Sequence, residues 1–138
     1  DSNYSSDELI TIASMIESEI QVDGERKTAA GVIYNRLEQG MKLQIDSTVQ
    51  YANNTRNEVV TTNDLQIDSL YNTYKYEGLP VGPICNPGEA AIEAAVNPEN
   101  NDYLYYVVKQ RGSGEHVFTS SYDEFLKAKE EYQKSFNN

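Results

Sequence analysis

Apolar residues near the start of the chain follow the period of an α-helix. They form one stripe made of Leu9, Ile12, Ala13, Ile16 and Ile20. Ser5, followed three residues later by Glu8, has the spacing of an N-terminal capping box, in which each side chain accepts a hydrogen bond from the other residue's backbone N–H. The pattern therefore predicts that the chain opens with an amphipathic helix.

A second helix is predicted over residues 25–37, with an apolar face of Ala29, Ala30, Ile33 and Leu37. Asp23 is its candidate N-cap. Gly40 is its expected stop, because glycine readily adopts the left-handed conformation that ends a helix. From residue 41 to residue 84 the polarity is irregular, and only a short helical turn capped by Thr62 is predicted there. A stretch of this length inside a compact domain is usually a functional loop.

Regular structure is predicted again in the last third of the chain. Asn86 is a candidate N-cap for a helix over residues 87–96 that has proline at its first position. The β-rich runs 103–109 and 116–119 flank a glycine-containing turn and predict a hairpin. Ser121 and Glu124 have capping-box spacing at the start of a last helix, about residues 123–133. The order predicts one helix-rich α+β domain over residues 1–138, without repeats or a linker.

Composition excludes several function classes. The 138 residues include 11 Lys+Arg and 22 Asp+Glu, which gives a net charge of −11. A nucleic-acid partner is therefore not expected, because such binding needs concentrated positive charge. One cysteine and one histidine exclude multi-cysteine zinc sites and an HExxH site. No apolar run approaches the about 20 residues of a membrane span. We expect no metal and no cofactor.

Glu17 is the first candidate for catalysis, because it falls beside Ala13 and Ile20 on the shoulder of the first apolar stripe. A carboxyl group there is partly desolvated, which favours the neutral form that a glycosidase uses to protonate a leaving oxygen. The simpler interpretation, a helix-edge glutamate in contact with water, is favoured by the pattern alone. Glu19 lies on the opposite shoulder and is expected to be solvated or to support its neighbours.

Other polar residues leave two interpretations open. Asp46 in the run LQIDST could be a second carboxylate of a glycosidase or an ordinary turn residue. The tyrosines of residues 71–76 could line a sugar-binding cleft or cover the core. His116 is better explained as a hydrogen-bonded strand residue than as a catalytic base. Cys85 is better explained as a small buried residue than as a nucleophile.

Several longer runs, taken in order, resemble the YceG-like family of endolytic murein transglycosylases. They are IASMIESE, AAGVIYNRLEQGMKLQIDSTVQYA, YNTYKYEGLPVGPICNPGEAAIEAAVNP, YLYYVV and GEHVFTSS. The resemblance implies a lysozyme-like catalytic domain that cleaves the β-1,4 bond between N-acetylmuramic acid and N-acetylglucosamine in nascent peptidoglycan. It places the catalytic acid/base at Glu17, which would protonate the glycosidic oxygen and then deprotonate the muramyl 6-hydroxyl. The product would be a 1,6-anhydromuramyl end.

The resemblance also implies which residues surround the substrate. Glu19 and Asn35 would support the acid, and the expected substrate contacts are Gln44, Asp46, Thr48, Tyr71, Asn72, Thr73, Tyr74, Leu79 and Pro80. Ser47 stands where the family usually has proline, and Ala52 stands where glycine is common. Family members usually carry an N-terminal membrane anchor. The chain is therefore expected to be a fragment that works on the extracytoplasmic face of the bacterial membrane, on peptidoglycan strands and with peptidoglycan synthases as partners.

Two alternatives to a transglycosylase stay open at this stage. A lysozyme-type muramidase would use Glu17 with Asp46 and water, and its products would have reducing ends. A non-catalytic glycan-binding module of the cell-wall machinery would bind strands without cleaving them. The chemistry of the product distinguishes the first alternative, and binding without turnover distinguishes the second.

Overall fold

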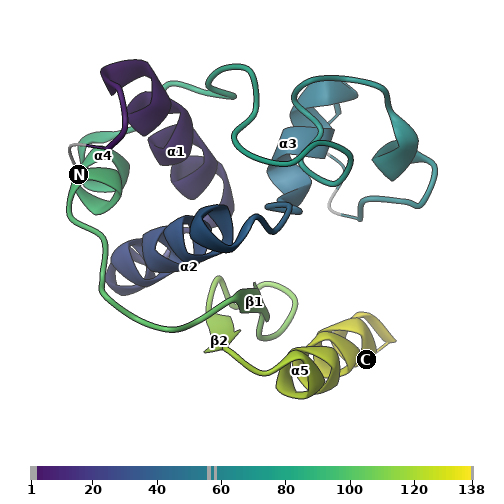
Figure 1. The fold of residues 1–138 in the computed structure, drawn as a ribbon. Coiled ribbons are helices and arrows are strands. Elements are labelled where there is room, and N and C mark those ends of the chain that lie inside the picture. Colours follow the sequence, from purple (N-terminus) through teal and green to yellow (C-terminus); the bar gives the residue numbers. More distant parts are fainter. Residues whose placement is uncertain (1–2, 56, 58, 138) are drawn as a thin grey trace.

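The computed structural model describes residues 3–55, 57 and 59–137 and has an α+β fold, as predicted (Figure 1). The α-helices of this described part are α1 (Ser6–Glu19), α2 (Arg26–Gln39), α3 (Asp46–Ala52), α4 (Glu89–Val96) and α5 (Tyr122–Lys134). Its strands are β1 (Tyr105–Val108) and β2 (His116–Thr119), and its short 3-10 helices are Asp23–Glu25, Asp64–Gln66 and Ser135–Asn137.

Helix α1 is the centre of the fold. It packs most extensively on α4 and also contacts α2 and α3. Its middle turns are fully buried because they are largely apolar. Positions 12–16 carry Ile12, Ala13, Met15 and Ile16, with Ser14 as the one polar residue among them. The alanines of α2 and α4 allow the three helices to approach closely. Figure 1 shows these helices grouped together, with α3 and the long segment after it on one side and the hairpin with α5 below α2.

Three predicted helix ends are confirmed. The Glu8 N–H donates to Ser5 Oγ at 3.1 Å and the Ser5 N–H donates to Glu8 Oε1 at 2.8 Å, which completes the capping box of α1. Gly40 ends α2 in the left-handed conformation, with φ of 69°. The Ser121 hydroxyl accepts from the Glu124 N–H at 3.2 Å at the start of α5. Each of these helix ends is formed by hydrogen bonds between residues three or four positions apart, so the local sequence contains both partners.

Two other predicted caps are wrong. Asp23 begins a 3-10 turn and its carboxylate pairs with Arg26, so that α2 begins at Arg26 after a Glu25 N-cap that makes no side-chain cap bond. Helix α4 begins at Glu89 after Gly88, rather than at Pro87 after Asn86. The backbone N–H of Gly88, just before the helix, donates to the Glu17 carboxylate, and local spacing cannot reveal such a distant partner.

The irregular region from residue 41 to residue 84 contains more structure than the pattern predicts. Helix α3 was not expected, and the 3-10 turn Asp64–Gln66 is closed by Thr61 rather than Thr62. The Asp64 N–H donates to Thr61 Oγ1 at 3.1 Å, and the Thr61 N–H donates back to the Asp64 carboxylate at 2.9 Å. Within the described residues, no helix combines the length and apolar character that crossing a membrane requires.

Helix α2 positions the segment that leads into the hairpin. A Cβ added to Gly31 would lie 2.6 Å from the Glu99 carbonyl oxygen, so the absence of a side chain lets this segment lie directly on the helix. One turn later the Asn35 amide donates to the carbonyl oxygens of Asn101 and Tyr103, both at 2.9 Å. Arg36 continues the series with a bond of 2.6 Å from Nε to the Leu104 carbonyl. The start of β1 is thereby fixed against α2.

The hairpin is attached to the turn between α1 and α2 by His116. Its backbone N–H and its Nδ1 lie 3.0 and 2.9 Å from the two carboxylate oxygens of Glu25. The prediction of a hydrogen-bonded strand residue at this position is confirmed. Strand β1 runs antiparallel to β2 with Val108 opposite His116, and α5 covers the outer face of the hairpin through the ring pair Tyr105 and Phe125. This attachment brings Tyr106 toward the end of α1.

Candidate active site

The last residue of α1, Glu19, lies where three segments of the fold meet. The Tyr106 hydroxyl of β1 donates to Glu19 Oε1 at 3.1 Å. The backbone N–H of Ser47, in the first turn of α3, donates to Glu19 Oε2 at 3.1 Å. Both carboxylate oxygens are thus held by donors far away in the sequence, and the side chain has a defined orientation.

A second carboxylate, Asp46, lies close enough to Glu19 for its charge to act on it. Asp46 is exposed, and its Oδ1 accepts a short hydrogen bond of 2.5 Å from the Tyr74 hydroxyl. Glu19 is only partly exposed. The site therefore combines one desolvated carboxyl group with one solvated carboxylate, the type of asymmetry that separates acid and base roles in hydrolytic enzymes.

Burial raises the pKa of Glu19 to about 6, and the negative charge of Asp46 acts in the same direction. The hydrogen bonds from Ser47 and Tyr106 oppose this rise, because they stabilise the charged form. Burial also raises the pKa of Tyr106 and of Tyr74, and the neighbouring carboxylates raise both further. The two phenols thus stay protonated and act as hydrogen-bond donors.

Glu17 is on the other side of the same helix. Two residues along an α-helix are about 200° apart around its axis, so Glu17 and Glu19 point in nearly opposite directions. Glu17 Oε1 accepts a hydrogen bond of 2.8 Å from the backbone N–H of Gly88, at the start of α4. In this position Glu17 connects α1 to α4 and is separate from the group around Glu19.

Several predicted substrate contacts form hydrogen bonds inside the fold. Thr48 and Thr73 are fully buried, and their hydroxyls are 2.9 Å from each other. Asn72 is also fully buried, with its amide bonded to the carbonyls of Leu65 and Ile67. These three residues hold the loops that present Asp46 and Tyr74, whereas Asn35 holds the segment before β1. Gln44, with φ of 53°, is exposed two positions before Asp46.

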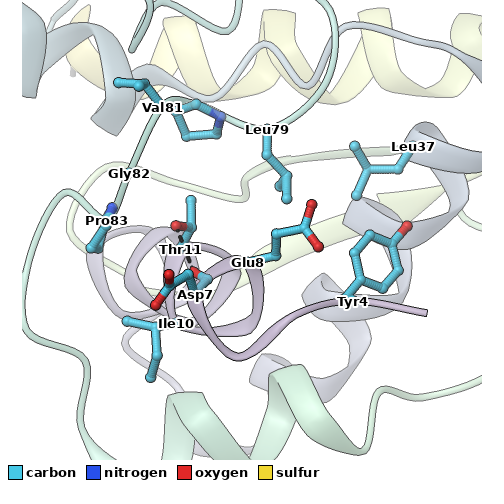
Figure 2. Close-up of a pocket in the computed structure, with 11 residues that line it drawn as sticks. Tyr4, Asp7, Glu8, Ile10, Thr11, Leu37, Leu79, Val81, Gly82 and Pro83 are labelled. Carbon is cyan, nitrogen blue, oxygen red and sulfur yellow. Dashed lines mark hydrogen bonds between the residues drawn. The ribbon is translucent and has the colours of Figure 1, made fainter. Parts of the chain in front are cut away.

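Leu79 and Pro80 line a different space, a cavity of about 700 Å³ at the N-terminal end of α1 (Figure 2). The other lining residues come from the start of α1, the end of α2 and the loop after Leu79: Tyr4, Asp7, Glu8, Ile10, Thr11, Leu37, Val81, Gly82 and Pro83. Tyr71 lies between this cavity and α3, because its hydroxyl is 3.4 Å from where a Cβ of Gly82 would be and its ring is 4.8 Å from that of Tyr51.

The sequence profile of the YceG-like family matches residues 1–131. The chain belongs to this family. It is 48% identical over 129 residues to an endolytic murein transglycosylase of Bacillus subtilis (strain 168), and the aligned region covers 94% of this chain and 35% of that protein. It is 40% identical over 110 residues to an endolytic murein transglycosylase of Streptococcus pneumoniae serotype 2 (strain D39 / NCTC 7466), which covers 76% of this chain and 20% of that protein.

A solved structure supports the same relationship. The crystal structure of a yceG-like protein from Listeria monocytogenes superposes with a TM-score of 0.87 at 42% identity, over 91% of this chain and 41% of that one. The YceG-like chain thus spans about a third of the length of the Bacillus relative and a fifth of the Streptococcus relative. The expectation of a YceG-like fold is confirmed.

Two residues of this candidate site were not selected by sequence reasoning: Ser47 and Tyr106. Tyr106 is 87 positions from the carboxylate it contacts, and no local pattern connects the two. Within the described residues, no group of three or more His, Cys, Asp or Glu side chains is arranged to hold a metal ion.

Glu19 makes the stability of this YceG-like domain depend on pH. Its folded pKa of about 6 lies above the ordinary value of 4.5, so the native state binds more protons than the unfolded state between these values. The free energy of unfolding contributed by Glu19 therefore falls as pH rises through this window. The free energy of unfolding of Glu19→Gln minus that of the parent is therefore expected to increase by roughly 1–2 kcal/mol from pH 4 to pH 7, measured by urea unfolding. An equal difference at both pH values would contradict the shift.

Proposed function

We propose that this chain is the catalytic domain of an endolytic murein transglycosylase and that Glu19 is its general acid/base. The proposal is supported by two curated relatives of that name, which match 94% and 76% of the chain. The observation that carries the choice of residue is the arrangement around Glu19: a partly buried carboxyl group with a raised pKa, fixed by two donors, next to an exposed carboxylate.

The resemblance by itself points to Glu17, and the contacts favour Glu19. The Glu17 carboxylate satisfies the backbone N–H that precedes α4, which is a structural task. Glu19 has the environment that an acid needs, because burial and Asp46 both favour the protonated form that donates to a leaving oxygen. The distinction is testable, since the two glutamates are on opposite sides of one helix.

In the proposed reaction Glu19 serves twice. The neutral carboxyl group first protonates the glycosidic oxygen, and the bond between C1 of N-acetylmuramic acid and that oxygen breaks. The resulting carboxylate then takes the proton of the muramyl 6-hydroxyl while the oxygen of that hydroxyl bonds to C1. This step forms the 1,6-anhydro ring and restores the neutral acid, so no water is consumed. Asp46, held by Tyr74, supplies a negative charge near the positive character that develops at C1.

Lysozyme-type hydrolysis is the second candidate, favoured by the position of Asp46 close to Glu19. In that reaction Asp46 would act as nucleophile or base and water would be consumed. The test is mass spectrometry of uncrosslinked glycan strands after incubation with the protein. We expect fragments with 1,6-anhydromuramyl ends. Reducing ends would instead support hydrolysis, and strand binding without any fragments would support a glycan-binding module.

The place of action follows from the proposed substrate. Peptidoglycan lies outside the cytoplasmic membrane, so the protein would work on the extracytoplasmic side, close to the synthases that make new strands. A membrane anchor and a synthase partner are part of this proposal through the family resemblance. The location is tested by adding a protease to intact spheroplasts. A protein on the extracytoplasmic side should be degraded while the membrane is intact.

A further inference from the structure

We propose that Ser47 is a positioning residue for Glu19: it holds the carboxylate through its backbone N–H and keeps a buried hydroxyl in the same turn, so that proton donation by Glu19 becomes easier. This inference rests on the proposed function, and it extends the site by a residue whose own side chain takes no part in bond breaking. Ser47 is 6% exposed, and it follows directly after Asp46 in the first turn of α3.

The contacts of Ser47 support this role. Its N–H is 3.1 Å from Glu19 Oε2, the oxygen that Tyr106 does not contact. Its hydroxyl is buried and has no hydrogen-bond partner of normal geometry among the described residues. A buried hydroxyl without a partner destabilises the fold, so a role toward a neighbouring group would account for it. The Glu19 carboxylate is the nearby group that this hydroxyl influences.

The charges around Glu19 come from each element packed against it. The α3 residue Asp46 and burial both favour the protonated form of Glu19, while Ser47 and the β1 residue Tyr106 favour the ionised form. Tyr74, in the loop after α3, stays neutral and bonds to Asp46. The Arg36 guanidinium of α2 acts on Tyr74 and Tyr106, and it donates to the Lys42 carbonyl at 2.5 Å.

The balance matters because the acid must release its proton during the reaction. When Glu19 protonates the glycosidic oxygen it becomes a carboxylate in a partly desolvated position next to Asp46. Donors that are already in place stabilise that new charge without any rearrangement. Loss of the Ser47 N–H should therefore raise the pKa of Glu19 and weaken it as an acid.

The experiment uses three serine variants. Ser47→Pro removes both the N–H and the hydroxyl, whereas Ser47→Ala removes the hydroxyl alone. Ser6→Pro is the matched control, because it places proline at the first position of α1, where the N–H is not needed and proline is tolerated. The Glu19 carboxyl is titrated by carbon-13 NMR, and the pH profile of strand cleavage is measured with the same proteins.

We expect Ser47→Pro to raise both the Glu19 titration midpoint and the pH above which cleavage falls by about one pH unit. Ser47→Ala should give a smaller rise, and Ser6→Pro should give none. An unchanged Glu19 midpoint in Ser47→Pro would overturn the proposal. A raised Glu19 midpoint with an unchanged pH profile of cleavage would also overturn the proposal, and it would remove Glu19 from the proposed reaction. An unchanged midpoint, in contrast, would leave the proposed function intact.

A fourth variant keeps the test decisive if Ser47→Pro does not fold. Tyr106→Phe removes the opposite donor to Glu19 and retains the ring that packs on His116 and Phe118. Combined with Ser47→Ala, it leaves the Ser47 N–H as the remaining donor to Glu19 among those described. We expect the double variant to raise the Glu19 midpoint by more than Tyr106→Phe alone. Equal midpoints in the two would show that the Ser47 hydroxyl has no effect.

Discussion

Glu19→Gln is expected to lower the rate of glycan-strand cleavage by about a hundredfold or more while the protein stays folded. The amide keeps the shape of the side chain: its oxygen can accept from the Ser47 N–H and its NH2 group can donate to the Tyr106 hydroxyl oxygen, but it can neither donate an acidic proton nor take one back. General acid/base groups contribute about 10²- to 10⁴-fold to such reactions. Release of 1,6-anhydromuramyl fragments, followed by mass spectrometry, measures the loss.

Glu17→Gln is the matched control, two positions before Glu19 on α1. Its amide oxygen can still accept from the Gly88 N–H, so the attachment of α4 is weakened rather than removed. We expect this variant to retain most of the cleavage rate. If Glu17→Gln were the inactive variant and Glu19→Gln the active one, the acid/base would be Glu17, as the family resemblance alone implies.

Asn72→Ala is expected to reduce the free energy of unfolding by about 3 kcal/mol or more. The Asn72 side chain is fully buried; its amide donates to the Leu65 and Ile67 carbonyls, and its oxygen accepts from the Tyr74 N–H, each at 2.9 Å. Each buried group left without a partner costs about 1–3 kcal/mol. Urea unfolding followed by circular dichroism gives the value.

The comparison variant for Asn72 is Asn53→Ala. The Asn53 amide also donates to two carbonyls, those of Val49 and Asp64, but this side chain is only partly buried and water can replace the lost bonds. Its loss of stability should be clearly smaller. If Asn72→Ala instead kept its stability and lost affinity for glycan strands, Asn72 would be a substrate contact rather than a support of the loop.

The elements that the sequence predicts well are those whose determinants are local. Ser5 and Glu8 contain both halves of a cap, and Gly40 needs no partner to end a helix. Strand β2 was predicted over the same residues that form it, because it lies between a glycine turn and the Ser121 cap. Helix α3 was missed because it has only seven residues and lacks a side-chain N-cap bond.

The candidate site was harder to predict because its contacts are distant in the sequence. Glu17 was a candidate for its place on the shoulder of the apolar stripe and received the catalytic role from the family resemblance, and its hydrogen-bond partner is Gly88, 71 positions away. The environment of Glu19 depends on Ser47 and Tyr106, which lie 28 and 87 positions away. The resemblance correctly indicated the family, but a motif with two glutamates two residues apart does not indicate which side of the helix faces the substrate.

The distance between Glu19 and Tyr106 along the chain also bears on biosynthesis. A polypeptide that emerges from the ribosome presents α1 before β1, so Glu19 has no phenol partner until the chain has been extended by the 87 positions that separate it from Tyr106. The hairpin can take its place only after α2 has folded, because Gly31, Asn35 and Arg36 hold the segment that precedes it. A chain that ends before β1 would therefore lack the Tyr106 donor to Glu19, and the proposed acid would be assembled only once the hairpin is in place.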